Sequence, residues 1–126
     1  MIKEVEFIVY TSDQEESKKF YSKLFDVAPC LDVPGMVEFK LNPGVKFGIM
    51  PEKGIKKIIG DTLPDPASGN GIPRCELYIK VKDAQLYLER AIGFGAQLVD
   101  EFKLRDWGDK VGYVSDRDGN VVAIAE

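Results

Sequence analysis

The stretch EFIVYTSD, residues 6–13, has the same pattern as ELYIKVKD, residues 76–83, with an acid at each end and alternating apolar residues between. Because successive side chains of a strand point to opposite faces, each stretch predicts a β-strand with one apolar face. In the first stretch, Glu6, Ile8 and Tyr10 share a face. A strand pattern that recurs after 76 − 6 = 70 residues predicts that one folding unit is used twice.

The same order of elements follows each of these strands. After the first, SDQEESKKFYSKLFDV predicts a helix, with Ser12 or Asp13 as its N-cap and acids in its first turn. After the second, AQLYLERAIGFG predicts a helix that ends at its glycines. Three strand patterns come next in each half, and these are CLDV, MVEFKL and VKFGIM, then AQLVDEFKL, KVGYVSD and NVVAIAE.

This duplicated order predicts a single α+β domain over residues 1–126. Module one covers residues 1–50, a connecting segment residues 51–74, and module two residues 75–126. The connecting segment is rich in Gly, Pro and Asp and contains one short apolar helical pattern, IKKII. A connection of this length is either a crossover between the repeats or a lid or part of a binding mouth.

The composition argues against several classes of protein. No run approaches the ~20 apolar residues that span a bilayer, and a net charge of −4 with interleaved lysines disfavours nucleic acid as a partner. The amino-terminal MIKEVEF carries charge where a secretion signal is apolar. We therefore expect a cytoplasmic protein with no membrane partner, in which Cys30 and Cys75 are reduced thiols.

The sequence contains no histidine. Its absence excludes Ser-His-Asp and Cys-His catalysis and every histidine-ligated metal site. Any chemistry must then use carboxylates, lysine, tyrosine or thiols. Of the two thiols, only Cys75 has a neighbouring cation, Arg74, that would lower its pKa.

Two segments give the sequence a family resemblance. The closing segment RDWGDKVGYVSDRDGN, residues 105–120, joins a Trp-Gly pair to an aspartate-rich hairpin turn in which Gly119 or Asn120 takes a positive φ. With the opening EFIVYTSDQEESKKFYSKLF and the doubled order, it resembles the glyoxalase, bleomycin-resistance and extradiol-dioxygenase superfamily, the vicinal oxygen chelate proteins. The resemblance covers nearly the whole chain. It implies two βαβββ modules whose curved mixed sheets enclose a cavity, with the helices outside.

The resemblance also implies where metal ligands would lie. In metal-dependent members the ligands come from the first and last strands of each module, and these positions fall on Glu6, Glu76, Gly48 and Ala123. The usual histidine and glutamate set is absent, so we expect no metal and no other cofactor. Mg²⁺ or Mn²⁺ held weakly by the two glutamates is the alternative. The small Gly48 and Ala123 would leave room for a ligand.

Glu6 and Glu76 have two interpretations. Repulsion and burial in a shared cavity would raise the pKa of one carboxyl, which could then carry a proton or bind a cationic ligand. Alternatively, each forms an ordinary ion pair at a strand end.

The aromatic residues are equally open to two interpretations. They could form flat walls for a planar or cationic guest, or they could be ordinary core. Arg105 and Asp109 beside the tryptophan either line a cavity mouth or form a solvated surface pair. With the residues above, the predicted ligand-binding set is Glu6, Tyr10, Gly48, Glu76, Tyr78, Trp107, Tyr113 and Ala123.

Three functions fit these observations. The first, similar to the bleomycin-resistance branch, is a metal-independent homodimer that sequesters a cationic or aromatic small molecule and catalyses no reaction. The second is a lyase or isomerase in which Glu6 or Glu76 moves a proton beside a carbonyl. The third is a structural or interaction role without a ligand.

Overall fold

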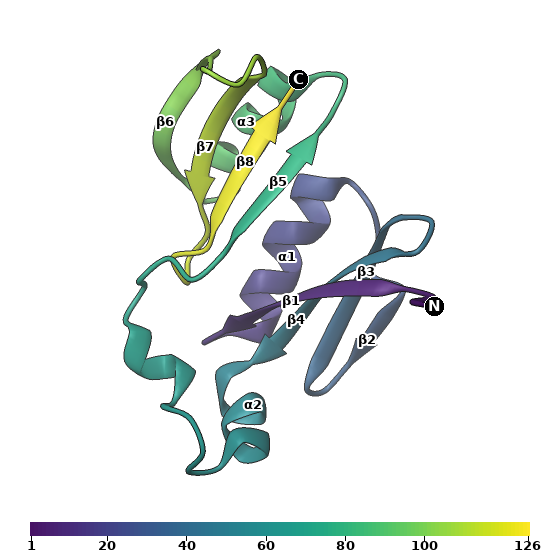
Figure 1. Cartoon of the computed structure of the whole chain (residues 1–126), viewed down its shortest axis with the longest axis vertical. Helices are drawn as coiled ribbons and strands as arrows, with labels where there is room; N and C mark the ends of the chain where they lie inside the picture. The colour runs from purple at the N-terminus through teal and green to yellow at the C-terminus, as the bar shows by residue number, and fades with distance from the viewer. The chain divides into compact units, whose positions relative to one another are not determined.

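The computed structural model describes all residues from 1 to 126. The chain forms two compact units, Met1–Asn70 and Gly71–Glu126. Each unit contains a four-stranded mixed sheet, so the duplicated α+β order predicted from the sequence is confirmed (Figure 1). No helix has both the length and the apolar character needed to cross a membrane.

The first unit is a sheet of strand order β1-β4-β3-β2, in which β1 and β4 are parallel and the other pairs antiparallel. A helix, α1, follows β1, and a shorter helix and a 3₁₀ turn follow β4 (Figure 1). The IKKII pattern lies inside that shorter helix. The elements are β1 (Val5–Thr11), α1 (Gln14–Phe25), β2 (Leu31–Val33), β3 (Met36–Asn42), β4 (Val45–Pro51), α2 (Glu52–Ile59) and η1 (Pro66–Gly69).

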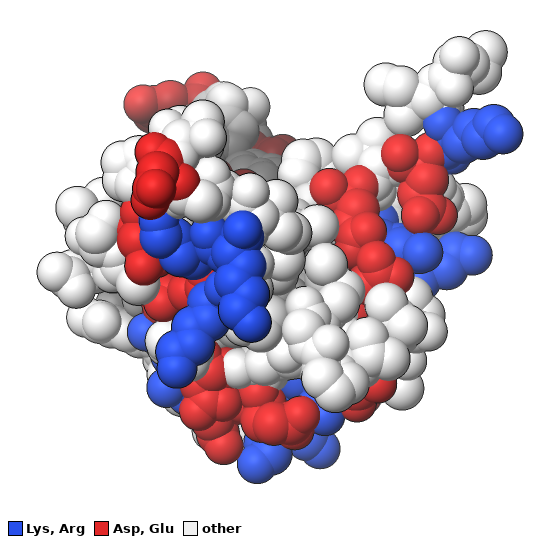
Figure 2. Space-filling view, turned by 90° about the horizontal axis from the view of Figure 1, so that it is seen from below, with Lys and Arg blue, Asp and Glu red and all other residues white.

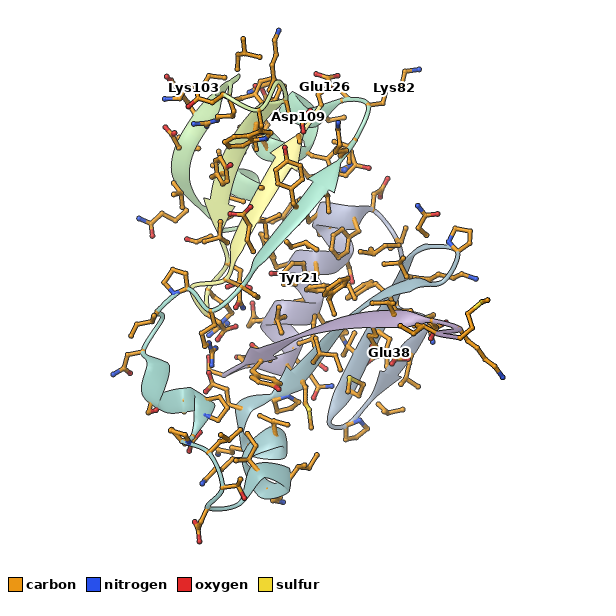
Figure 3. All side chains as sticks on the ribbon, in the orientation of Figure 1. Tyr21, Glu38, Lys82, Lys103, Asp109 and Glu126 are labelled. Carbon is orange, nitrogen blue, oxygen red and sulfur yellow. The ribbon has the colours of Figure 1, made fainter.

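Helix α1 packs its apolar stripe on one face of this sheet. Asp13 is the N-cap, because its side chain accepts a hydrogen bond of 3.1 Å from the amide of Glu16. The ring of Tyr21 contacts Phe47 of β4 with 4.5 Å between centroids (Figure 3). Alternation along the strands places Glu6, Ile8 and Tyr10 on the opposite face, called here the open face of the first sheet. The buried residues of α1 are Ser17, Phe20, Tyr21 and Leu24.

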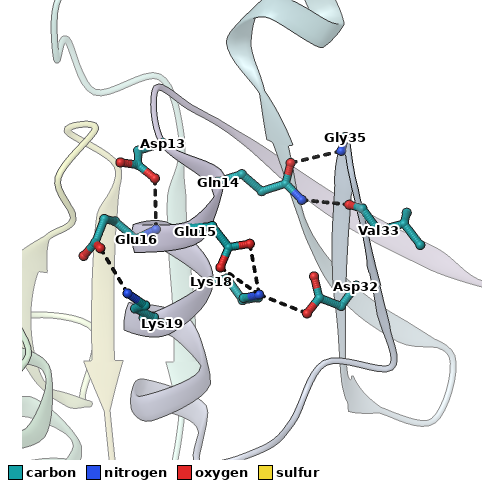
Figure 4. A network of polar contacts seen from close by, with 9 residues as sticks. All are labelled: Asp13, Gln14, Glu15, Glu16, Lys18, Lys19, Asp32, Val33 and Gly35. Carbon is teal, nitrogen blue, oxygen red and sulfur yellow. Dashed lines mark hydrogen bonds and ion pairs between the residues drawn. The ribbon is translucent and has the colours of Figure 1, made fainter.

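The first turn of α1 also holds the β2–β3 hairpin (Figure 4). The amide group of Gln14 donates to the carbonyl of Val33 at 2.8 Å and accepts from the backbone of Gly35 at 3.0 Å. One turn later, Lys18 forms an ion pair of 3.0 Å with Asp32. These bonds fix the short edge strand β2 against the helix.

The second unit repeats the arrangement with strand order β5-β8-β7-β6. Helix α3 packs closely on one face, because a Cβ on Gly112 would lie 2.8 Å from a methyl carbon of Leu88. The other face is called here the open face of the second sheet. The elements are β5 (Glu76–Lys80), α3 (Ala84–Gly93), β6 (Gln97–Leu104), β7 (Lys110–Ser115) and β8 (Val121–Ala125).

The closing turn of the second unit is stabilised by its own side chains. The carboxylate of Asp116 accepts from the backbone amides of Asp118 and Asn120 at 2.9 Å each, and from the Asn120 side chain at 3.0 Å. Gly119, rather than Asn120, takes the positive φ, at +85°. The turn packs so closely on Gly71 that a side chain at position 119 would meet that backbone.

Charged residues of both signs are intermixed on the surface. On the face drawn in Figure 2, lysine and arginine side chains lie directly beside aspartate and glutamate side chains. This distribution accompanies a modest net charge of −4.

Candidate functional site

On the open face of the first sheet, the side chain of Glu6 lies across Gly48. In the strand register, Gly48 of β4 stands between Ile8 of β1 and Glu38 of β3. A Cβ on Gly48 would lie 2.5 Å from Oε1 of Glu6. The missing side chain therefore lets the Glu6 carboxyl pass over β4 and hydrogen-bond with Glu38.

This environment raises the pKa of Glu6 to about 7, chiefly through burial and then through the hydrogen bond to Glu38 and repulsion from it. Oε1 of Glu6 is buried and accepts no hydrogen bond from an N–H or hydroxyl group. Two carboxyl groups bond to each other only when one carries a proton. The Glu6–Glu38 pair therefore holds a proton near neutral pH.

Lys46 is the cation that lowers the pKa of Glu6, although its ion pairs are with other acids. Its Nζ lies 3.2 Å from Glu4 and 3.6 Å from Glu38, and these contacts raise the pKa of Lys46. Although Lys46 is the register partner of Glu6, it only partly offsets the raised pKa of Glu6. The sequence interpretation missed Glu38, yet the alternation in MVEFKL, with an acid between Val37 and Phe39, is a signal that places it on the open face.

The second unit contains a chain of hydrogen bonds that includes the only tryptophan. The indole N–H of Trp107 donates to the hydroxyl oxygen of Tyr78 at 2.9 Å. The hydroxyl of Tyr78 donates to Asp109 at 2.6 Å, and Lys80 donates to the other oxygen of that carboxylate at 3.0 Å. Asp109 lies at the end of the sheet near the chain terminus Glu126 (Figure 3). Four side chains from β5 and the β6–β7 loop therefore form one fixed cluster.

The charge states within this cluster follow from its bonds. Hydrogen bonds from Tyr78 and then from Lys80 lower the pKa of Asp109. Desolvation, followed by the bond to Asp109, raises the pKa of Tyr78. Asp109 is thus a carboxylate and Tyr78 a neutral phenol at neutral pH, which is the arrangement that the donor directions require.

Arg105 belongs to a second cluster on the same loop. Its guanidinium lies 4.9 Å from the ring centroid of Tyr113 and forms an ion pair of 2.6 Å with Asp100. It also donates to the carbonyl of Val111 at 2.7 Å and 3.0 Å. Of the two alternatives for Arg105 and Asp109, the solvated pair is wrong, because the Arg105 side chain is only 12% exposed and its carboxylate partner is Asp100.

The structure places the predicted site residues in two groups. Glu6, Tyr10 and Gly48 lie on the open face of the first sheet. The second group shares the open face of the second sheet, where Ala123 is the cross-strand neighbour of both Tyr78 and Tyr113. Trp107 joins this group through its bond to Tyr78, and Glu76 lies exposed on the same face of β5.

The two small residues make room for this protein's own side chains. Gly48 accommodates the carboxyl of Glu6. Ala123 is fully buried in a cluster with Val111 and Ala125, and Tyr113 packs against them. The expectation that Gly48 and Ala123 leave space for a ligand is therefore corrected in each unit, because these neighbouring side chains fill the space.

Cys75 does not have the environment of a nucleophile. Burial, followed by the negative charge of Asp116, raises the pKa of the Cys75 thiol and outweighs the lowering effect of Arg74. A thiol with a raised pKa is mostly protonated at neutral pH and reacts slowly. Cys30 lies in the exposed loop before β2, where its thiol donates to the carbonyl of Glu38 at 3.4 Å.

Comparisons with known proteins agree with this architecture. Among solved structures, a glyoxalase-related enzyme from Fulvimarina pelagi superposes with a TM-score of 0.81 and 23% identity, covering 96% of this chain and 85% of that one. A glyoxalase/bleomycin resistance protein/dioxygenase family enzyme from Burkholderia phytofirmans superposes with a TM-score of 0.76 and 15% identity, over 95% and 94% of the chains. These likenesses define the fold class.

The family itself follows from the sequence. A model of the glyoxalase-like domain matches residues 5–126, so the chain belongs to the glyoxalase-like domain family. An uncharacterised protein of Mycobacterium bovis is 27% identical over 111 residues, which span 86% of this chain and 72% of that protein. The predicted superfamily is confirmed.

The residues at the family's ligand positions do not fit a metal ion. No group of three or more Cys, Asp or Glu side chains is arranged to hold one. Gly48 and Ala123 offer no side-chain donor atom, and Glu6 shares its proton with Glu38 beside the cation Lys46. A bound cation would have to displace that proton and tolerate the ammonium charge.

Proposed function

We propose that this protein binds and sequesters a small planar molecule on the open face of its second sheet, without a metal ion. The observation that supports the proposal is Trp107, whose side chain is fixed by a bond to Tyr78 although the residue is 58% exposed. Large aromatic residues are mostly buried in folded proteins. An exposed ring held in one orientation supplies stacking area with little loss of side-chain entropy on binding.

The bonding of the cluster favours binding over catalysis. Trp107 and Tyr78 use their only N–H and O–H donors within the chain of bonds, and both oxygens of Asp109 are occupied. Such groups present ring faces to a ligand and have no free acid or base to offer it. The proposal keeps the homodimer and the cytoplasmic location that the sequence predicts.

A stacking probe tests this proposal. Calorimetric titration of neutral acridine into chelator-treated protein should show saturable binding. Trp107→Leu should weaken binding at least tenfold, which corresponds to about 1.4 kcal/mol of lost stacking. Tyr87→Leu, which removes a ring from α3, is the matched control and should bind as the wild type does. Equal affinity of wild type and Trp107→Leu would contradict the proposal.

Proton transfer by Glu6 is a second candidate, supported by its pKa of about 7. A group with such a pKa both holds and releases a proton near neutral pH, as a general acid–base requires. If Glu6 transfers protons, the wild type should catalyse exchange of solvent deuterium into the carbon beside the carbonyl of an α-hydroxyketone, which NMR would follow over a panel of such compounds. Glu6→Gln should abolish the exchange, whereas Glu76→Gln should retain it. Absence of catalysed exchange across the panel would remove this candidate.

A further inference from the structure

We infer that Asp109 is a specificity-determining residue, which acts through Tyr78 to make the Trp107 ring favour a planar cation over a neutral ring of the same shape. The inference rests on the proposed function, because it concerns the ligand class of the same site. It assigns a role to a residue that does not itself need to touch the ligand.

The directions of the hydrogen bonds carry the argument. Trp107 donates to Tyr78, and Tyr78 donates in turn to the carboxylate of Asp109. Bonds arranged head to tail polarise one another, and this chain ends on a negative charge. The indole N–H is therefore polarised towards Tyr78, which leaves more electron density on the ring. An aromatic face with more electron density attracts a cation more strongly.

The bond lengths show which link is strongest. The Tyr78–Asp109 distance of 2.6 Å is at the short end for a hydroxyl and a carboxylate, as expected for a charge-assisted bond. Lys80 bonds the second oxygen and keeps Asp109 ionised, and its side chain is 62% exposed. Solvent therefore screens the charge of Lys80, whereas the polarisation of the indole N–H passes through the hydrogen bonds.

The neighbouring arginine does not compete for the Trp107 face. Arg105 stacks on Tyr113 and is held there by Asp100 and by the carbonyl of Val111. An internal guanidinium over the indole would have occupied the position of a cationic ligand. Because Arg105 is fixed elsewhere, the tryptophan face remains for an external cation.

The test compares two probes of matched shape, N-methylacridinium and acridine, at a pH where acridine is neutral. In the wild type, N-methylacridinium should bind about fivefold more tightly than acridine, as cation–π attraction at an exposed site provides. Asp109→Asn should reduce this preference to less than about twofold while acridine affinity changes little. Tyr78→Phe should reduce the preference to the same extent, and it should also weaken acridine binding, because it removes the hydrogen bond that holds the Trp107 ring. In both variants the indole N–H resonance of Trp107 should move upfield, because its hydrogen bond weakens or is lost.

The control separates polarisation through the bonds from simple loss of charge. Asp106→Asn removes an exposed acid directly beside Trp107 in the chain and should leave the preference unchanged. The inference would be overturned if the preference for N-methylacridinium over acridine persisted in Asp109→Asn, or if it fell equally in Asp106→Asn. In either case, binding of acridine by the wild type would still support the proposed function. Failure of the wild type to bind either probe would instead refute the proposed function.

Discussion

Replacing Gly119 with alanine is expected to lower the free energy of unfolding by about 3–4 kcal/mol. The φ of +85° is a conformation that costs a residue with a side chain about 1–2 kcal/mol. In addition, the new Cβ would lie 2.7 Å from the carbonyl carbon and 2.8 Å from the Cα of Gly71, with the carbonyl oxygen nearer still. Because these are backbone atoms, the turn or the segment at Gly71 must move.

The control for this prediction is Gly95→Ala. Gly95 has a φ of +104°, yet a Cβ there would meet no atom within 4 Å. That variant should lose only the conformational part, about 1–2 kcal/mol. Urea unfolding of the two variants and the wild type makes the comparison. Equal losses of unfolding free energy in the two variants would show that the contact between Gly119 and Gly71 contributes nothing to the effect of Gly119→Ala.

Glu6→Gln is expected to increase stability above pH 7 and to remove a pH dependence. The pKa of Glu6 rises from 4.5 to about 7 on folding, so between these values the folded state binds more protons than the unfolded state. Stability therefore falls as the pH rises through this window, and the loss is complete above it. Because the site is partly exposed to solvent, we expect a gain of about 1–2 kcal/mol for Glu6→Gln at pH 8.

Unfolding free energies at pH 4 and pH 8 provide the measurement. Below the unfolded pKa of 4.5, Glu6 is protonated in both states, so wild type and Glu6→Gln should have similar stability. Glu76→Gln is the matched control, since Glu76 lies exposed at the start of the equivalent strand. If the difference in unfolding free energy between the wild type and Glu6→Gln is the same at pH 4 and pH 8, the raised pKa of Glu6 is refuted.

The order of elements could be predicted because it depends on local patterns. Alternation identified the strands, and Ser12 or Asp13 with the acids after it identified the start of α1, where Asp13 is the N-cap. Gly119 was assigned to a turn because few other residues accept a positive φ. Each of these signals lies within a few residues of the structure that it specifies.

The clusters of the candidate site could not be predicted in the same way. Tyr78 and Asp109 are 31 residues apart, and their bond depends on how the β6–β7 loop folds back over β5. Likewise, Glu6 reaches Glu38 only because β4 places Gly48 between them. The sequence showed that position 48 was small, but it did not show that a side chain of the same sheet fills the space.

The most direct test of the account is a titration of acridine into the chelator-treated protein, monitored by the indole N–H resonance of Trp107. Because the chain contains one tryptophan, this signal reports on a single site. We predict a saturable shift of that resonance, with the midpoint unchanged on addition of Mg²⁺ or Mn²⁺. A resonance that does not respond, or one that responds only when a divalent cation is present, would contradict a metal-independent site at Trp107.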